Sequence, residues 1–264
     1  MKLVRVTAQN RCTLGPGIAA LEAIASYPLG EDRFTIDHGT DYFAFFERLG
    51  ELAYYALLDG PRVVAVGCGM IRTIPHGRTQ RRVWYLGDLK VHPDYRGRHL
   101  PLQMLDWSFA THYLRCRRGY AISMDPPSGE NRIVRMMKNF RWLPVSPPVK
   151  LLLYSLPADA MAQVAPVLER HRGPIGFLSL AGIKDIVLES TGKPLPLQHV
   201  QWGALGRPTH RDPVAGATHM FAAPERDPLA TDLRAAGLAP AATASVLHHG
   251  MSGWDLGFVL TSDI

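Results

Sequence analysis

The chain of 264 residues has few cysteines. Cys12, Cys68 and Cys116 are odd in number, lie far apart and form neither a Cys-x-x-Cys pair nor a Cys/His cluster. This pattern favours neither a disulfide framework nor a structural zinc site, and reduced thiols in a reducing compartment are the simpler interpretation. We therefore expect a protein without a metal.

Long hydrophobic runs are also missing. No apolar run approaches the roughly 20 residues that a bilayer-spanning helix needs, and the first twelve residues lack the apolar stretch of a signal peptide. We therefore expect a soluble, cytoplasmic protein without a membrane partner. With 47% hydrophobic residues, the chain has enough apolar material for a core, and its length suits one large domain or two small ones.

Positive charge is concentrated in the first part of the chain. Residues 1–155 contain 21 Lys and Arg and 13 Asp and Glu, whereas residues 156–264 contain 8 and 10. A basic surface can bind nucleic acid, an acidic carrier protein or a phosphorylated cofactor, and charge alone does not choose among them. Residues 78–82 form a tight arginine cluster. Because no nucleic-acid motif accompanies it, nucleic acid is the weakest of the three partners.

Apolar periodicity and turn residues divide the first part of the chain into alternating strands and helices. Asp59-Gly60-Pro61 separates two apolar, partly β-branched runs, which predicts a hairpin. Residues 28–40 are expected to be a loop. In order, we expect a strand over 2–8, helices over 17–27 and 40–50, a hairpin over 52–74, a strand over 81–91, a helix over 100–117, a strand over 119–125, a helix over 129–140 and a strand over 148–157.

The remaining residues form a second region, so we expect domains at 1–155 and 156–264. Its clearest part is an Asp N-cap and a Gly stop around a helix at 227–237, which follows a strand at 218–224. A helix over 160–171, a loop over 201–217 and a closing pair of strands over 241–250 and 254–263 complete the prediction. Both regions are thus of the α/β (α+β) class.

The centre of the chain carries the sequence DLKVHPDYRGRHLPLQML, residues 88–105. It predicts a strand that ends at a proline, an Arg-Gly-Arg turn and a helix. This stretch and the order of elements around it resemble the GCN5-related N-acetyltransferase (GNAT) superfamily over roughly residues 1–155. The residues that match the family's V-x-P-x-Y-R-G approach are Val91, Pro93, Tyr95, Arg96 and Gly97.

The resemblance implies a mixed, mostly antiparallel central sheet flanked by helices, and a coenzyme A site at the turn. A helix N-terminus exposes unpaired amides and a positive dipole end, which suits a pyrophosphate. His99 and Pro101 occupy the family's two small-residue positions, so we expect a modified site for acetyl-CoA or another acyl-CoA. The resemblance implies that coenzyme contacts come from Leu89, Val91, Arg96, Gly97, Arg98, His99, Leu100 and Asn131.

The resemblance makes Asp88 the candidate general base, with pairing to a nearby arginine as the structural alternative. The family's tyrosine acid is missing near Met137 and Lys138, and Tyr120, Ser128 or ordered water remain open as substitutes. Acceptor binding is expected around residues 28–43, where Glu31 and Asp32 would suit a cationic amine.

The order of elements in the second region also resembles the back half of a GNAT domain, which suggests a degenerate second copy. It has no phosphate turn, so any coenzyme is expected in the first domain only. His248 and His249 are neighbours on an alternating strand, and we expect a structural role because opposite faces do not chelate one metal readily.

The sequence thus predicts an acyl-CoA-dependent N-acetyltransferase that moves an acyl group to a primary amine of a small molecule, amino acid or peptide. Two alternatives stay open: a decayed GNAT-fold binding or regulatory module, and an acyltransferase that uses an acyl carrier protein. The oligomeric state is also open, a homodimer included.

Overall fold

The computed structural model describes residues 1–29, 32–138 and 145–264. Within it the chain forms two compact units. The first unit comprises Met1–Thr73, Arg82–Ala121 and Gly182–Pro194, and the second comprises Ile74–Arg81, Ile122–Ala181 and Leu195–Ile264. The segment Gly182–Pro194 therefore belongs to the first unit although it lies late in the sequence. The expected division at residue 155 stays a prediction.

The first unit is built on a sheet with the strand order β1-β4-β5-β6-β7. β1 pairs with β4, and β4 with β5, in antiparallel register, whereas β6 and β7 are parallel. β6, α3 and β7 follow one another along the chain, so α3 makes the crossover connection that a parallel pair requires. The strands are β1 (Lys2–Val6), β4 (Glu51–Asp59), β5 (Arg62–His76), β6 (Thr79–Val91) and β7 (Gly119–Met124).

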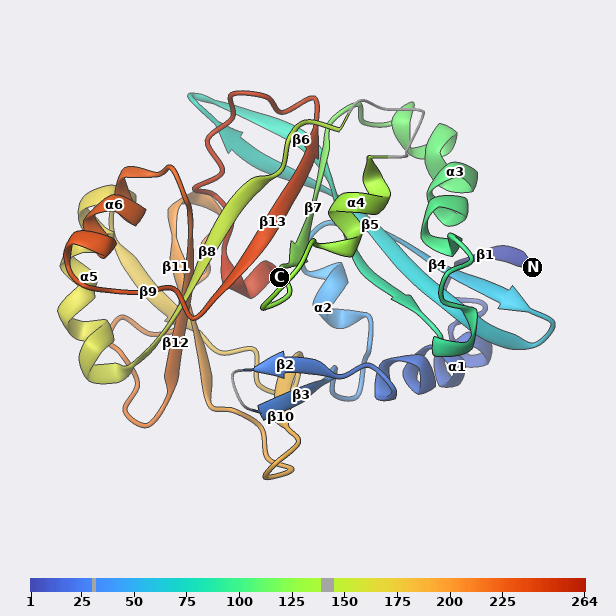
Figure 1. Ribbon diagram of the computed structural model, residues 1–264, viewed down its shortest axis with the longest axis horizontal. Helices are drawn as coiled ribbons and strands as arrows, with labels where there is room; N and C mark the ends of the chain where they lie inside the picture. Colours follow the sequence, from blue (N-terminus) through green and yellow to red (C-terminus); the bar gives the residue numbers. More distant parts are fainter. Residues whose placement is uncertain (30–31, 139–144) are drawn as a thin grey trace. The chain divides into compact units, whose positions relative to one another are not determined.

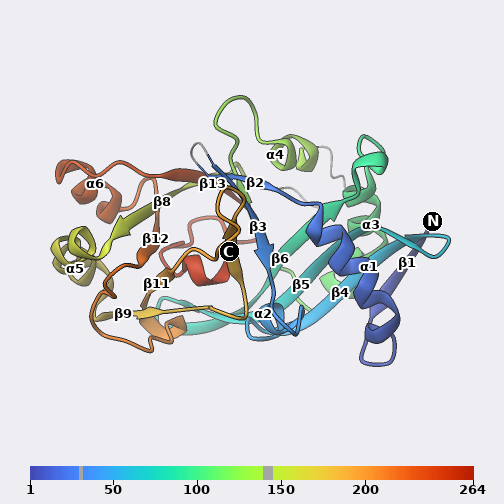
Figure 2. The same ribbon diagram turned by 90° about the horizontal axis from the view of Figure 1, so that it is seen from below.

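The helices of the first unit are α1 (Arg11–Ala23), α2 (Ala44–Glu47) and α3 (Leu100–Tyr113), with a 3-10 turn η1 at Pro93–Tyr95. Figure 2 shows α1 running across β4 and β5. α3 packs Leu100 and Met104 against Leu57, Val64 and Ala65 of these strands. The helix over 100–117 and the hairpin over 52–74 are thus confirmed.

A separate three-stranded antiparallel sheet lies in the same unit (Figure 1), in the order β10-β3-β2. β2 is Tyr27–Leu29, β3 is Asp32–Asp37 and β10 is Asp185–Leu188. The expectation of a loop over residues 28–40 was therefore wrong. β3 pairs with its neighbour β2 and also with β10, and local signals could not show the second pairing because β10 lies far along the chain.

Two helices of the first unit also differ from their predicted extents. α1 begins at Arg11 and not at residue 17. The helix thus includes Gly15 and Pro16, which lie outside the predicted helix over 17–27. α2 is a short helix at Ala44–Glu47 and not the expected helix over 40–50. Its aromatic residues Phe45 and Phe46 are buried, as their helical spacing predicts.

The second unit has the sheet order β13-β8-β12-β11-β9. β11 and β12 are parallel, whereas β13 with β8, β8 with β12, and β11 with β9 are antiparallel. Its core includes Tyr154, Met161, Phe177, Phe221 and Leu229. The elements are α4 (Arg132–Met137), β8 (Val149–Pro157), α5 (Ala158–Arg172), β9 (Ile175–Leu178), β11 (Leu197–Trp202), η2 (Gly203–Leu205), β12 (Thr218–Pro224), α6 (Pro228–Ala235), β13 (Ala242–His249) and η3 (Thr261–Asp263).

Asp227 caps α6 as predicted, since its side chain accepts a hydrogen bond from the Leu229 amide at 2.9 Å. The predicted last strand over 254–263 was wrong, because this part contains only turns and η3. The expected loop over 201–217 begins with the end of β11. Both units are mixed α/β with mostly antiparallel sheets flanked by helices, which confirms the predicted fold class.

All three cysteines are free thiols, with Cys12 exposed and Cys68 and Cys116 buried. Among the described residues, no helix combines the length and the apolar character that crossing a bilayer requires.

Candidate active site

Asp88 lies near the end of β6 in an unusual backbone conformation. Its φ is 53°, and His99 is the only other non-glycine residue with a positive φ in the described part of the chain. Left-handed backbone costs about 1–2 kcal/mol for most residues, although Asp and Asn adopt it more readily. Such strain clusters at functional sites, so this observed outlier supports a functional role for Asp88.

Three side chains contact the buried carboxylate of Asp88, whose exposed fraction is 3%. The Tyr54 hydroxyl lies 2.5 Å and the Tyr42 hydroxyl 2.8 Å from Oδ2. The Lys90 ammonium donates to Oδ1. The structural alternative predicted that Asp88 pairs with an arginine. Asp88 does form an ion pair, but its partner is Lys90, two positions along the same strand.

Lys90 also contacts a second buried carboxylate. Its Nζ lies 2.7 Å from Oε2 of Glu22, a residue of α1. Burial disfavours the charged ammonium, but the charges of Asp88 and Glu22 outweigh burial and raise the pKa of Lys90. Lys90 is thus a charged lysine held between two acidic side chains.

Glu22, whose side chain is 6% exposed, is the second acid of this cluster. The Tyr42 hydroxyl lies 2.8 Å from its Oε2, and the Nε2 atom of His38 lies 3.6 Å away. Burial opposes ionisation of Glu22, but the hydrogen bond with His38 and the charge and hydrogen bond of Lys90 prevail and lower its pKa to about 2. Burial, followed by the charge of Asp88, raises the pKa of both Tyr42 and Tyr54, so both phenols keep their protons.

Sequence reasoning missed most of this cluster. Glu22, Tyr42, Tyr54 and Lys90 were not predicted as site residues. One signal was available: Asp88 and Lys90 alternate with Leu89 and Val91, so a lysine shares the face of the candidate base.

The segment Gly182–Pro194 adds a further lysine to this unit. Nζ of Lys184 lies 4.3 Å from the centroid of the Phe45 ring, and Phe45 in turn contacts His38. Burial, followed by the charge of Lys90, lowers the pKa of Lys184 to about 8. Sequence reasoning missed Lys184 because no element was predicted for the segment that carries it, and that segment lies far in sequence from the rest of the first unit.

The opposite face of β6 carries Leu89 and Val91. Val91 packs against the cluster that contains Leu100 and Met104 of α3, whereas Leu89 is 40% exposed. The strand thus presents acids and a lysine on one side and apolar residues on the other. The predicted coenzyme contacts of Leu89 and Val91 stay predictions.

The turn after β6 has the shape expected of an anion site. Arg96 is extended, Gly97 has φ 80°, and His99 has φ 54° and precedes α3 as its N-cap. Residues 96–99 are exposed, while Leu100 is buried and anchors the helix. His99 therefore takes a left-handed position that glycine adopts without strain.

The amides of this turn are available for a ligand. Within the described ranges, no backbone carbonyl accepts a hydrogen bond from the amides of Gly97, Arg98, His99 or Leu100. Pro101 has no amide to contribute, although proline is tolerated in the first turn of a helix. The Arg98 guanidinium lies over the Tyr95 ring at 4.7 Å. The exposed amides and α3's N-terminal dipole fit a pyrophosphate.

The structure brings together Asp88, Leu89, Val91 and the turn residues 96–100 on one strand-turn-helix segment of the first unit. Asn131 belongs to the second unit, where it caps α4: its Oδ1 accepts from the Ile133 amide at 3.0 Å, and its Nδ2 donates to Asp125 at 2.9 Å. These bonds occupy the Asn131 amide within the fold. Its predicted contact with coenzyme A stays a prediction.

The candidates for the missing acid lie in different surroundings. Tyr120 is buried, stacks on Tyr85 and accepts a hydrogen bond from Arg72 at 3.0 Å. Ser128 is exposed. Lys138, near the position of the missing tyrosine, pairs with Glu130, and its side chain is 66% exposed.

Of the two predicted acceptor residues, Glu31 lies outside the described residues. Asp32 begins β3 and its Oδ2 accepts a hydrogen bond from the Ser190 hydroxyl at 2.5 Å. Hydrogen bonds from Ser190 and the Arg33 amide lower the pKa of Asp32. Asp32 thus fastens β3 to the Gly182–Pro194 segment, and its role in substrate binding stays a prediction.

Oxygen and nitrogen atoms of Glu22, His38 and Asp88 lie within 4.8 Å of one another. The Lys90 ammonium already bonds both carboxylates. Because a side chain supplies the positive charge that such a cluster requires, we assign no metal ligands here.

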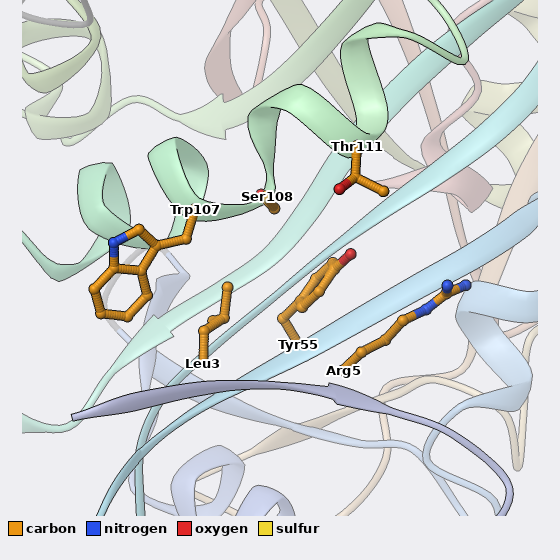
Figure 3. Close-up of a pocket in the computed structure, with 6 residues that line it drawn as sticks. All are labelled: Leu3, Arg5, Tyr55, Trp107, Ser108 and Thr111. Atoms are coloured by element: carbon orange, nitrogen blue, oxygen red, sulfur yellow. The ribbon is translucent and has the colours of Figure 1, made fainter.

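A shallow hollow of about 430 Å³ lies elsewhere on the first unit, between α3, β1 and β4. Figure 3 shows Trp107, Ser108 and Thr111 from the helix above Leu3, Tyr55 and Arg5 from the strands. None of the predicted site residues lines it. It is therefore separate from the candidate active site.

Residues 21–125 match the sequence profile of the acetyltransferase (GNAT) family. This part of the chain is a GNAT-family domain. The match covers β6, the turn and α3 together with Glu22, Tyr42 and Tyr54. The family assignment supports acyl transfer as the class of reaction, and it confirms the resemblance drawn from the sequence.

Solved structures share the fold at low identity. A protein of Thermoplasma acidophilum, provisionally assigned as an acetyltransferase, is 14% identical, covers 94% of this chain and 99% of its own, and has a TM-score of 0.50. A GCN5-related N-acetyltransferase from Anabaena variabilis ATCC 29413 is 9% identical, with coverages of 94% and 72% and a TM-score of 0.49. Among curated proteins, no sequence matches the chain.

Proposed function

We propose that this GNAT-family chain is an acyl-CoA-dependent N-acyltransferase that acetylates, or otherwise acylates, a primary amine of a small molecule, amino acid or peptide. The observation that carries the proposal is the strand-turn-helix segment from Asp88 to α3. It combines a strained buried carboxylate with a turn of exposed amides. The proposal keeps the cytoplasm as the location.

The turn would hold the pyrophosphate of the acyl donor. Gly97, Arg98, His99 and Leu100 offer amides, and Arg96 offers a side-chain cation. Backbone amides at a helix N-terminus bind phosphate without any special side chain, so His99 and Pro101 alter the site but do not remove it. Leu89 and Val91 would orient the acyl carbonyl and the pantetheine arm through their backbone.

Coenzyme A supplies the acyl group as a thioester. Asp88 would accept one proton from the acceptor's ammonium, and the neutral amine nitrogen then forms a bond to the acyl carbon. The carbon–sulfur bond then breaks, the nitrogen releases its second proton to ordered water, and the leaving thiolate takes up a proton from that water. Tyr54 would hold the Asp88 carboxylate in place through its hydroxyl, at 2.5 Å.

The acceptor is proposed to be a cation at neutral pH. Glu22 and Asp88 together carry more negative charge than Lys90 neutralises, so the cluster favours an approaching ammonium. Glu31 and Asp32 would add to this preference. We also propose that the second unit is a degenerate GNAT-like copy.

Calorimetric titration with acetyl-CoA tests the donor site. We expect micromolar binding that Arg96→Ala weakens about tenfold, because a charged hydrogen bond contributes roughly 1.5–3 kcal/mol. Arg211→Ala, which removes an exposed arginine from the second unit, is the matched control. No binding at millimolar acetyl-CoA would contradict the proposal and favour an acyl carrier protein as donor.

One observation favours a decayed binding module as the second candidate. Asp88 already has a positive partner in Lys90, which is the arrangement of a structural ion pair. Binding of acetyl-CoA without acyl transfer to any amine would identify this alternative.

A further inference from the structure

One phenol bridges the two buried carboxylates of the cluster. The Tyr42 hydroxyl oxygen lies 2.8 Å from Oε2 of Glu22 and 2.8 Å from Oδ2 of Asp88. Both distances are those of full hydrogen bonds. A phenol has a single O–H hydrogen, so it can donate fully to only one of these oxygens.

The second contact therefore needs a proton from elsewhere. If Tyr42 donates to Glu22, its lone pair faces Asp88 and can accept a hydrogen bond from protonated Asp88. If Tyr42 donates to Asp88, the reverse holds and Glu22 would have to carry the extra proton. The two arrangements have opposite effects on the base, because one stabilises the acid form of Asp88 and the other its ionised form.

The surroundings favour the first arrangement. Oδ2 of Asp88 already accepts from Tyr54 at 2.5 Å. Lys90 contacts both carboxylates, but Glu22 also has the His38 ring 3.6 Å from its Oε2, so Glu22 is the stronger acceptor for the Tyr42 hydrogen. The charge balance agrees: two carboxylates and one ammonium leave one negative charge, which a single proton on Asp88 would cancel.

We propose that Glu22 is a positioning residue, which turns the Tyr42 hydroxyl so that its oxygen accepts a hydrogen bond from Asp88 once Asp88 has taken the acceptor's proton. This inference rests on the proposed function, since it concerns the base of that reaction. It assigns Glu22 and Tyr42 a role that the sequence did not suggest. Asp88 alone touches the reacting proton.

Other titratable groups surround Asp88 from every packed element, and the test must hold them constant. They are Glu22 of α1, Tyr27 of β2, His38 and Tyr42 before α2, Tyr54 of β4, Cys68 of β5, Lys90 of β6 and Lys184 of the Gly182–Pro194 segment.

Tyr42→Phe separates the two arrangements by the sign of a shift, because it removes the hydroxyl without changing any charge. If Tyr42 accepts a hydrogen bond from protonated Asp88, the variant loses that bond and Asp88 is harder to protonate. The acidic midpoint of kcat/KM then moves to lower pH. We expect a shift of about one pH unit and a roughly tenfold loss of kcat/KM at neutral pH. If Tyr42 donates to Asp88, the midpoint moves to higher pH, which would overturn the proposal.

Glu22→Gln tests the positioning itself. The glutamine amide donates to the Tyr42 oxygen and turns the phenol hydrogen toward Asp88, so the midpoint again moves to lower pH. The double variant should lose no more than the larger single loss, because both residues act through one hydroxyl. Additive losses would contradict the proposal. Tyr55→Phe and Glu47→Gln are the matched controls. The Tyr55 hydroxyl lies 2.8 Å from Nε2 of His112, Glu47 pairs with Arg11, and neither residue contacts Asp88.

A readout on the unliganded protein separates this inference from the proposed function. The carbon-13 signal of the Asp88 carboxyl, assigned with Asp88→Asn, is titrated in wild type and Tyr42→Phe. A lower midpoint in the variant supports the role of Tyr42 even if no acyl transfer is found. An unchanged or higher midpoint overturns it, even if the protein proves to be an active transferase.

Discussion

Lys90 and Asp88, two residues apart on β6, form an ion pair with side chains that are 8% and 3% exposed. Glu22 completes the pair as a second acid, 2.7 Å from the same ammonium. Burying an ion pair costs the desolvation of every charge in it. The attraction between the charges offsets this cost only when they are in direct contact and hydrogen-bonded. The central strand of this GNAT-family domain therefore carries a buried cluster of two acids and one lysine where the family resemblance predicted one acid.

Removing the lysine should destabilise the protein strongly. Lys90→Met leaves Glu22 and Asp88 buried without a counter-ion, so we expect a loss of about 3–5 kcal/mol in the free energy of unfolding, measured by urea denaturation. Lys138→Met, which breaks the exposed pair with Glu130, should cost at most about 1 kcal/mol. Equal losses in the two variants would show that the buried cluster does not contribute to stability.

Stability should fall in acid because of Glu22. Its pKa is lowered from 4.5 to about 2 in the folded protein, so its contribution is present above the unfolded value and is lost as pH falls from about 5 to 2. The full contribution is on the order of 3 kcal/mol. In Glu22→Gln, the free energy of unfolding should change less over this range than in wild type. Parallel pH curves would contradict the role assigned to Glu22.

His99→Gly should stabilise the turn. His99 has φ 54°, which glycine adopts without the clash that a Cβ atom introduces, although glycine also loses more entropy on folding. We expect a net gain of about 0.5–1 kcal/mol in thermal or urea unfolding. His99→Ala keeps the Cβ atom and should show no gain. A destabilised glycine variant would mean that the imidazole makes a favourable interaction at this position.

Pro101→Ala should strengthen the donor site. The substitution restores one amide at the N-terminus of α3, where an anion would find it. If the pyrophosphate binds this turn, the Kd for acetyl-CoA should fall about threefold to tenfold in calorimetry. Pro208→Ala, in the second unit, serves as the control. An unchanged Kd would place the phosphate groups away from this amide.

Local sequence signals were sufficient for part of this architecture. The Asp59-Gly60-Pro61 turn predicted the β4–β5 hairpin, and the Asp227 cap with its glycine stop predicted α6. Such features depend on residues a few positions apart, so they are visible in one sequence. The three-stranded sheet was missed although β2 and β3 are neighbours in sequence, because its third strand, β10, pairs with β3 from more than a hundred residues later.

The candidate site also has a part that the sequence predicts and a part that it does not. Asp88 and the turn to Leu100 were found because they form one continuous motif. Glu22, Tyr42 and Tyr54 reach Asp88 from α1, the segment before α2 and β4. Nothing in their local sequence shows that tertiary packing brings them together. Strand periodicity could have placed Lys90 on the same face as Asp88. It could not have shown that Lys90 is buried, because Glu22 of α1 covers it.

Acyl transfer itself is the most direct test of the proposed enzyme. The protein is incubated with acetyl-CoA and a panel of amines, amino acids and peptides, and release of free thiol is followed beside Asp88→Asn, which keeps the left-handed backbone. We predict amine-dependent thiol release that falls at least a hundredfold in the variant. No amine-dependent release by wild type, or equal rates in the two proteins, would contradict the account.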